Sequence, residues 1–461
     1  MTSSSWAWWT TTVTFPGGSV DGYYAFMLVA TAFVLMMTVP ALALFYGGMS
    51  RSKSVLNMMM MSFIAAAIVG ILYVAVGWSM GFGGEGTFFA NPFELFWLDG
   101  VTTDNYIYVM FQMTFAIITA ALISGAVADR LKFSAWVVFL PLWALIVYFP
   151  MAHMVFSCTD DSLICGRIGA QDYAGGTAVH INAGVAALVL VLLLGKRIGW
   201  PKDQMRPHNL TLTMLGAGML WLGWYGFNVG SIVFGTTFDE DPDAFLAQFY
   251  SETGRTFANT TLATLAAILG WLLIERLLHG KATSLGAASG IVAGLVAITP
   301  AAGAVDISGA VAIGAIAGAV CAWAVSLKYK LGYDDSLDVV GVHLVGGIIG
   351  TVLIGVFSTS DGAGGVDGLL YGGGAGSLGD QTLGVLVAVA YSGILTAVIA
   401  LAIKYTIGLR LDEEDEVNGI DLAAHGETAY DLHSGTSGGG TGVLAASTST
   451  NAPASTKGVN A

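Results

Sequence analysis

Two histidines follow an aspartate at the same spacing in two separate apolar stretches of the sequence. Asp172 precedes His180 by eight residues in DYAGGTAVHINAG, and Asp335 precedes His343 by eight in DDSLDVVGVHLVGG. Ionisable side chains are costly to bury in a membrane, and they usually face a cavity or a partner. Imidazoles in an apolar lumen should be uncharged, so that each offers one hydrogen-bond donor and one acceptor. Such a pair can bind a small neutral polar molecule or relay a proton.

Each of these side chains also has a structural interpretation. A buried histidine can be satisfied by a backbone carbonyl, and zinc is the metal alternative for the pair. Two histidines without a cysteine or a third ligand nearby make a poor zinc site, so no metal and no cofactor are expected. Asp172 lies where its predicted helix begins, and there an aspartate commonly caps free backbone N–H groups. The functional alternative is that its negative charge holds a cation at a pore mouth.

The composition predicts a membrane protein. Of 461 residues, 55% are hydrophobic and only 10% are charged. A helix of roughly 18 or more apolar residues can cross a hydrocarbon core of about 30 Å, and we identify eleven such runs. They cover residues 24–46, 55–80, 107–127, 134–156, 173–195, 210–234, 257–278, 283–303, 307–327, 339–358 and 382–408. The predicted fold class is therefore an all-α polytopic membrane protein.

The basic residues predict the topology of these helices. Lys and Arg accumulate in short cytoplasmic loops, and fifteen of the seventeen basic residues lie in alternate connections or the tail. Only Arg167 and Arg255 lie on the other side. This bias places the amino end outside and the carboxyl end inside, and it supports an odd number of helices.

Eleven helices divide into two groups of five and one C-terminal helix. Because five is odd, the two halves insert with opposite orientation, as in the inverted repeats of many transporters. Eight residues of helix span about 12 Å, so His180 lies about 12 Å from the outer end and His343 about 12 Å from the inner end. The two histidines should nearly meet at the middle of the bilayer.

The chain ends and the loops carry other features. We expect an outer segment at 1–23, a membrane domain at 24–408, a cytoplasmic region at 409–433 and a disordered Gly/Ser/Thr-rich tail at 434–461. Cys158 and Cys165 share an outer segment, where a disulfide is allowed but not required, whereas Cys321 is expected to pack in a helix. The net charge of −14 comes largely from acidic outer loops such as FDEDPD, at 238–243, and from DEEDE, at 412–416 in the tail. Such charges suit either ordinary solvation or a high-salt environment.

Aromatic residues cluster toward the predicted outer side. They are Phe111 and Phe115 in FQMTFAIIT, Phe156 in MAHMVFS, and Trp224 and Phe227 in WYGFNVGS. A cation over an aromatic face gains roughly 0.5 to 2 kcal/mol, which would suit a small ammonium-like ion. Packing, or anchoring at the membrane interface, is the alternative role for such rings.

These motifs, with VAITPAAG and DLAAHGETAY, resemble those of the ammonium transporter family, the bacterial and archaeal Amt proteins. The resemblance covers about residues 20–431. It implies an outer ammonium site of Ser231, Phe111 and Phe156 with Asp172 close by, and a gate of Phe115 and Phe227 beneath it. It further implies a narrow apolar pore lined by His180 and His343, with Trp224 and Thr299 near the path. The family commonly has Trp where this chain has Phe156.

The resemblance also implies partners and a mechanism. It implies a homotrimer in the cytoplasmic membrane, with one pore per subunit and a PII-type (GlnK-like) signalling protein bound at the cytoplasmic face. Ammonium would lose its proton and cross as NH3, and we hypothesise that the proton crosses by a separate relay. The alternatives are an ammonium sensor acting through a partner and a Rh-like channel for NH3 or CO2. No nucleophile triad or metal constellation indicates an enzyme, and no nucleic-acid partner is expected.

Overall fold

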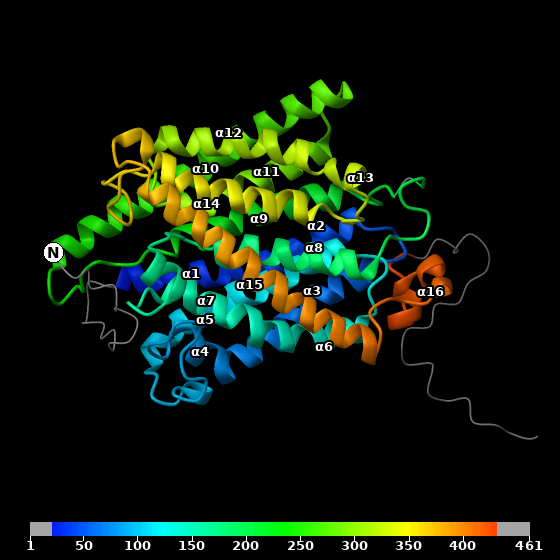
Figure 1. The fold of residues 1–461 in the computed structure, drawn as a ribbon, viewed down its shortest axis with the longest axis horizontal. Coiled ribbons are helices and arrows are strands. Elements are labelled where there is room, and N and C mark those ends of the chain that lie inside the picture. Colours follow the sequence, from blue (N-terminus) through cyan, green and yellow to red (C-terminus); the bar gives the residue numbers. More distant parts are fainter. Residues whose placement is uncertain (1–20, 204, 431–461) are drawn as a thin grey trace, which may run out of the picture.

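The computed structural model describes residues 21–203 and 205–430. Its regular structure is helical throughout these ranges, apart from two isolated β-bridges. The helices lie side by side along the long axis of the molecule (Figure 1). Residues 1–20 of the predicted outer segment and the predicted tail at 434–461 lie outside the described residues. The predicted all-α class is confirmed for the part of the chain that is described.

Residues 21–203 and 205–430 contain sixteen α-helices, and short 3₁₀ and π-helical turns connect or extend several of them. They are α1 (Asp21–Met36), α2 (Ala43–Met49), α3 (Val55–Leu72), α4 (Trp78–Phe82), α5 (Tyr106–Ile123), α6 (Phe133–Trp143), α7 (Phe149–Ala152), α8 (Asn182–Leu194), α9 (Leu210–Val229), α10 (Pro242–His279), α11 (Ser284–Ile298), α12 (Ile307–Ala324), α13 (Leu327–Leu331), α14 (Val345–Phe357), α15 (Gly376–Thr406) and α16 (Glu413–Asn418).

Ten helical spans in the described residues are long and apolar enough to cross a membrane. They are Gly22–Met49, Val55–Phe82, Thr103–Val127, Phe133–Ser157, Gly176–Leu194, Pro242–His279, Ser284–Ala301, Ile307–Leu331, Val340–Phe357 and Gly376–Thr406. The sixth predicted run, at 210–234, corresponds to the 20-residue helix α9, which is not among these ten. The count of eleven membrane helices therefore stays a prediction.

Helix α10 begins well before the apolar run predicted at 257–278. It starts at Pro242, inside the acidic stretch FDEDPD that was expected to be a loop. The Asp241 side chain accepts a hydrogen bond from the amide of Ala244, and proline suits the first helical position because its missing N–H needs no partner there. Capping signals, rather than hydropathy, fix where this helix begins.

Small residues allow the closest helix contacts. A Cβ atom at Gly314 of α12 would lie 2.1 Å from the carbonyl oxygen of Ala263 in α10, and one at Gly318 would lie 2.1 Å from that of Ala267. Neither position can hold a larger residue unless the helices move apart. Glycine at these sites serves close packing of membrane helices.

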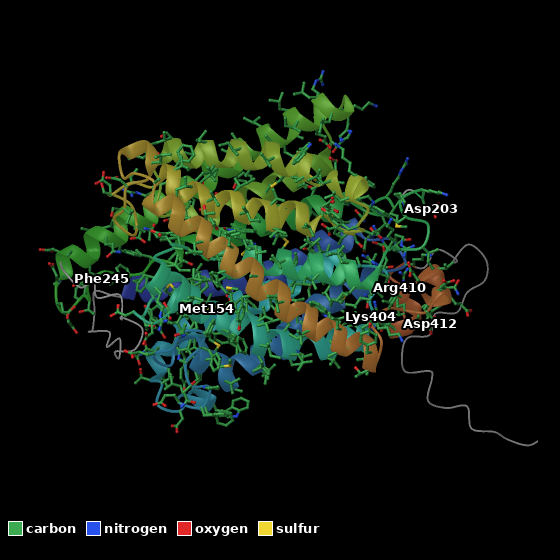
Figure 2. The ribbon with its side chains drawn as sticks, in the orientation of Figure 1. Met154, Asp203, Phe245, Lys404, Arg410 and Asp412 are labelled. Atoms are coloured by element: carbon green, nitrogen blue, oxygen red, sulfur yellow. A yellow bond between two sulfur atoms is a disulfide. The ribbon has the colours of Figure 1, made fainter. Side chains whose placement is uncertain are left out.

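The two ends of the bundle differ in charge. Figure 2 labels Arg410 and Asp412 at one end and Phe245, near the start of α10, at the other. We call the first the basic end, because it gathers arginines, and the second the acidic end, because it carries FDEDPD. The sequence predicts that the basic end is cytoplasmic and the acidic end is outside.

Buried ion pairs hold the loops of the basic end together. Arg197 contacts Asp129 at 3.1 Å and Asp334 at 2.8 Å, and Arg51 contacts Asp129 at 3.1 Å. The guanidinium of Arg197 holds the pKa of the Asp334 carboxyl below its ordinary value, although burial opposes this. Loops far apart in the sequence therefore share one network of charges.

The C-terminal region packs onto the same end. The Asp421 carboxylate accepts hydrogen bonds from the backbone N–H groups of Leu56 and Asn57, where α3 begins, at 3.0 and 2.8 Å. Glu416 accepts from the amide of Ile198 at 2.7 Å and pairs with Arg410 at 2.7 Å. These contacts tie residues after α15 to the loops that precede α3 and α9.

Candidate functional site

The two histidines meet in the centre of the bundle. His180 lies on a π-helical turn, Gly176–Ile181, and His343 on another, Val340–Leu344. Their Nδ1 atoms are 3.3 Å apart, and the rings are stacked with their planes inclined by 24°. Both side chains are buried. Between two neutral imidazoles, one Nδ1 must donate and the other must accept, so the two tautomers differ.

Each of these turns is preceded by an aspartate that caps it. The Asp172 carboxylate accepts hydrogen bonds from four consecutive backbone N–H groups, those of residues 175–178, at 2.7 to 3.1 Å. The Asp335 carboxylate accepts two, from Val339 at 3.1 Å and Val340 at 2.7 Å. Burial raises the pKa of Asp172, and the four amide donors partly offset that rise. The capping interpretation of Asp172 is therefore confirmed by its geometry.

A glycine makes the Asp172 cap possible. Gly175 has φ of 117°, in the left-handed region where side chains are disfavoured. The chain reverses there so that the next N–H groups point at the carboxylate. Asp172 thereby fixes the orientation of the turn that carries His180.

A small cavity adjoins the histidine pair. Only about 10 Å³ of it is open to the centre of a water-sized molecule, which is room for about one such molecule. The imidazoles of His180 and His343 and the ring of Trp224 carry the polar side-chain atoms of its lining. The other lining residues are apolar: Met37, Leu42, Phe45, Ile118, Leu122, Leu220, Phe227 and Val292. Nε2 of His180 is buried and has no hydrogen-bond partner among the described residues.

A column of aromatic rings leads from the cavity toward the acidic end. Phe227, which lines the cavity, stacks on Phe115 with ring centroids 4.0 Å apart and planes inclined by 10°. Phe115 contacts Phe111 at 4.9 Å and Phe156 edge-on at 6.4 Å. Phe115 and Phe227 are fully enclosed, whereas Phe156 is only partly buried. The stacked pair lies between Phe156 and His180 in this series of ring contacts.

Ser231 lies just beyond α9, on the same side. Its hydroxyl donates to the carbonyl of Phe227 at 2.8 Å, and its oxygen can still accept. A Cβ atom at the preceding Gly230 would lie 2.8 Å from the ring of Phe111, so glycine lets the chain pass close to that ring. The structure thus brings Ser231, Phe111 and Phe156 to one region, while the Asp172 carboxylate is occupied by backbone donors.

Trp224 contacts the histidine pair, and Thr299 contacts Trp224. Trp224 stacks on His180, with ring centroids 5.4 Å apart, and lines the cavity rather than the outer aromatic group. Thr299 does not line the cavity. Its hydroxyl oxygen accepts a hydrogen bond from Nε1 of Trp224 at 2.7 Å. Thr299 therefore orients the indole that faces the histidines.

Comparison with known proteins assigns the family. The model of the Ammonium Transporter Family matches residues 25–430. An ammonium transporter of Mycobacterium bovis is 52% identical over 446 residues, covering 89% of this chain and 90% of that protein. The chain belongs to the ammonium transporter family. It is therefore a multi-pass membrane transporter for ammonium rather than an enzyme, as the sequence motifs indicate.

Solved structures agree with this assignment. The crystal structure of Mep2 from Saccharomyces cerevisiae superposes with a TM-score of 0.74 at 33% identity, covering 85% of this chain and 90% of that one. A structure described as a sensor Amt protein superposes with a TM-score of 0.77 at 27% identity, covering 87% of this chain and 98% of that one. The helical arrangement of the transporter is shared with both.

Two further features of the transporter surround this site. Cys158 and Cys165, whose pairing the sequence leaves open, form a disulfide close to Phe156, and Cys321 is buried as predicted. His153 is fully buried and was not assigned a role. Its ring nitrogens lie 3.0 Å from the carbonyl oxygen of Gly81 and 2.7 Å from that of Gly86. The signal that could have found it is a histidine inside an apolar run.

Proposed function

We propose that the transporter conducts neutral NH3 past the histidine pair after ammonium gives up its proton at the acidic end. The observation that carries this proposal is the cavity of about 10 Å³, which His180, His343 and Trp224 line together with apolar residues; among the described residues Nε2 of His180 has no hydrogen-bond partner. Ammonia is small enough for this space, and it can accept and donate hydrogen bonds. An unpaired ion there would lose its hydration without compensation.

This arrangement accounts for selectivity against alkali ions. K⁺ and ammonium have the same charge and similar size, so neither property separates them. Ammonium can leave its proton behind and cross as a neutral molecule, whereas K⁺ cannot shed its charge. The proton follows a separate relay, so that net transport is electrogenic.

The outer residues have distinct roles in this proposal. Phe111, Phe156 and Ser231 receive ammonium, the rings through cation–π contact and the serine through its hydroxyl oxygen. Phe115 and Phe227 form the gate, since their stacked rings close the route and must separate to let a molecule pass. Asp172 preserves the turn that carries His180, and its charge favours a cation nearby.

We place the membrane domain at 24–408 and the cytoplasmic region at 409–433, in a homotrimer of the cytoplasmic membrane. The positive-inside rule supports N-terminus outside and C-terminus inside. A PII-type protein at the basic end would meet both the loops and the C-terminal region, because Asp421 and Glu416 tie the two together.

Two measurements separate transport from the alternatives. A cell that lacks its own ammonium transporters and grows poorly on low ammonium should recover when it expresses this chain, whereas a pure sensor would not rescue growth. Pulses of ammonium over the protein in a solid-supported membrane should evoke a current. Rescue without any charge movement would favour a passive gas channel.

A further inference from the structure

An aromatic loop, residues 86–98, joins α4 to the helix that follows. Its sequence, GTFFANPFELFWL, contains five aromatic residues, and Glu94 is its only charged residue. All five rings are exposed in the isolated chain, by 43% at Phe96 to 70% at Phe93. The others are Phe88, Phe89 and Trp97. A cluster of this kind marks a binding surface, because contact with water is unfavourable for so much apolar area.

The aromatic loop lies beside the bundle. In Figure 1, α4 and the chain that follows it lie along the lower side of the molecule, within the length of the helices. Phe88 stacks on Tyr391 of α15, with ring centroids 6.3 Å apart. Tyr391 is fifteen residues from the start of α15, which corresponds to about 22 Å of helix. The loop therefore reaches along the membrane-spanning surface instead of covering the pore mouth.

The neighbouring surface is already apolar and exposed. Leu386 and Ile394 of α15 are exposed by 60% and 64%, on either side of Tyr391 in the sequence. The Tyr391 hydroxyl donates to the carbonyl of Ile146, which is also exposed. Since α15 and the span that contains Ile146 cross the membrane, this face meets lipid or another membrane helix. The aromatic loop extends that face toward the acidic end.

The backbone of the aromatic loop forms hydrogen bonds with neighbouring parts of the bundle. The Ala90 amide donates to the carbonyl of Met80 at 2.8 Å, and the Asn91 carbonyl accepts from the Ser79 hydroxyl at 2.6 Å. The Gly86 carbonyl lies 2.7 Å from Nε2 of His153. Irregular backbone is tolerated near hydrocarbon only where its polar groups are satisfied in this way. His153 thereby receives a role in holding the loop against the bundle.

Strained backbone turns one ring outward. Trp97 and Leu98 both have positive φ, 55° and 62°, which is unfavourable for bulky side chains. This conformation leaves Trp97 half-exposed and buries Leu98. Leu98 anchors the loop while the Trp97 indole, apolar with one N–H donor, is directed away from the protein.

We propose that the aromatic loop inserts its exposed rings into the bilayer at the acidic end, at the boundary between headgroups and acyl chains. Tryptophan and other aromatic side chains favour that boundary, where an apolar ring and a polar tip are both accommodated. The low charge of the loop and its continuity with the exposed face of α15 identify lipid, rather than a soluble protein, as its partner.

Spin labels can measure directly whether the ring positions of the aromatic loop lie in lipid, in water or against protein. The full chain carrying Phe93→Cys would be labelled and reconstituted in phosphatidylcholine vesicles, and collisions with oxygen and with a water-soluble nickel complex would be recorded. Asp243→Cys is the matched aqueous reference, because Asp243 is exposed in the first turn of α10, whose 38 residues are far more than the roughly 20 that cross a bilayer. Ile71→Cys, exposed in the middle of a membrane span, is the apolar reference. The native cysteines are paired or buried, so the unsubstituted chain gives the labelling background.

The ratio of oxygen to nickel collisions should be several-fold higher at position 93 than at 243, and closer to that at 71. A ratio equal to that at 243 would place the ring in water and overturn the proposal. Protection from both reagents would place it against protein, and spin–spin broadening that disappears on dilution with unlabelled chain would identify a second copy. Trp97→Cys, in the same loop, repeats the test if Phe93→Cys fails to fold.

Discussion

Nδ1 of His180 and Nδ1 of His343 lie 3.3 Å apart, although 163 residues separate them in the sequence. Each imidazole lies on a π-helical turn, and an aspartate caps the backbone N–H groups where each turn begins. This symmetry holds both rings at the cavity, and within the described part of the chain neither ring forms an ion pair. The chemistry we propose depends on that placement, because a charged partner would favour imidazolium and make the cavity less apolar.

Replacing Asp172 by asparagine should weaken the cap. The second carboxylate oxygen now accepts hydrogen bonds from two backbone N–H groups. In asparagine an NH2 group, which cannot accept them, would take the place of that oxygen. We expect a loss of about 1 to 2 kcal/mol in the free energy of unfolding and strongly reduced ammonium current. Thermal unfolding and current would be measured together. If stability falls but the half-saturating ammonium concentration is unchanged, the residue acts as a cap alone and does not favour the cation.

Thr299→Val should disturb the indole of Trp224. Valine removes the acceptor for Nε1 of Trp224, and an unsatisfied buried N–H costs about 1 to 3 kcal/mol. Thr299→Ser keeps the hydroxyl and is the matched control. Transport by the valine variant should fall below that of the serine variant. Equal transport by both would mean that the hydrogen bond does not position the tryptophan.

Phe156→Trp should tighten the outer site. Tryptophan has a more negative ring face than phenylalanine, so an added cation–π energy of about 1 kcal/mol would lower the half-saturating ammonium concentration about fivefold. Phe156→Leu, which removes the ring, should raise that concentration. The current at increasing ammonium concentrations measures both. No change in either variant would exclude Phe156 from the ammonium site.

Much of the fold follows from patterns that are local in the sequence. Apolar runs locate the membrane helices, and the equal spacing of Asp172–His180 and Asp335–His343 anticipates two similar turns that meet. The start of α10 was missed because hydropathy does not detect a helix that continues into an acidic segment. A capping aspartate followed by proline, Asp241–Pro242, was the available signal.

The site was less predictable where contacts join distant polar groups. The resemblance places Thr299 only near the path, and the fold alone reveals that its hydroxyl accepts the hydrogen bond of Trp224. The docking of Asp421 onto the start of α3 joins residues 364 and 365 positions apart, with no local pattern to mark it. The position of the aromatic loop likewise depends on α15, which lies almost 300 residues later.

Asp334→Asn should destabilise the basic end. It would leave the fully buried Arg130 without its carboxylate partner and Arg197 with Asp129 alone, at a cost of about 3 to 5 kcal/mol. Asp161→Asn is the control, since its pair with Arg167 is exposed and should contribute about 0 to 1 kcal/mol. Thermal unfolding of both variants would be compared. Equal midpoints would contradict the structural role of Asp334.

The Asp334 carboxylate should also make the stability of the fold depend on pH. The folded-state pKa of Asp334 is below its ordinary value of 3.8, so its stabilisation is present above pH 3.8 and is lost as pH falls through the lowered pKa. Unfolding midpoints measured downward from pH 5 should fall more steeply for the unsubstituted chain than for Asp334→Asn. Parallel curves would show that this group does not contribute.

The histidine pair is tested most directly by current in proteoliposomes. Ammonium and K⁺ would be applied in turn to the unsubstituted chain, to His180→Ala and to His343→Ala, with correct folding checked by gel filtration and thermal unfolding. We predict an ammonium current with no K⁺ current in the unsubstituted chain, and in each folded variant either loss of the ammonium current or entry of K⁺. Unchanged ammonium current and complete exclusion of K⁺ in both variants would contradict the role of the two imidazoles.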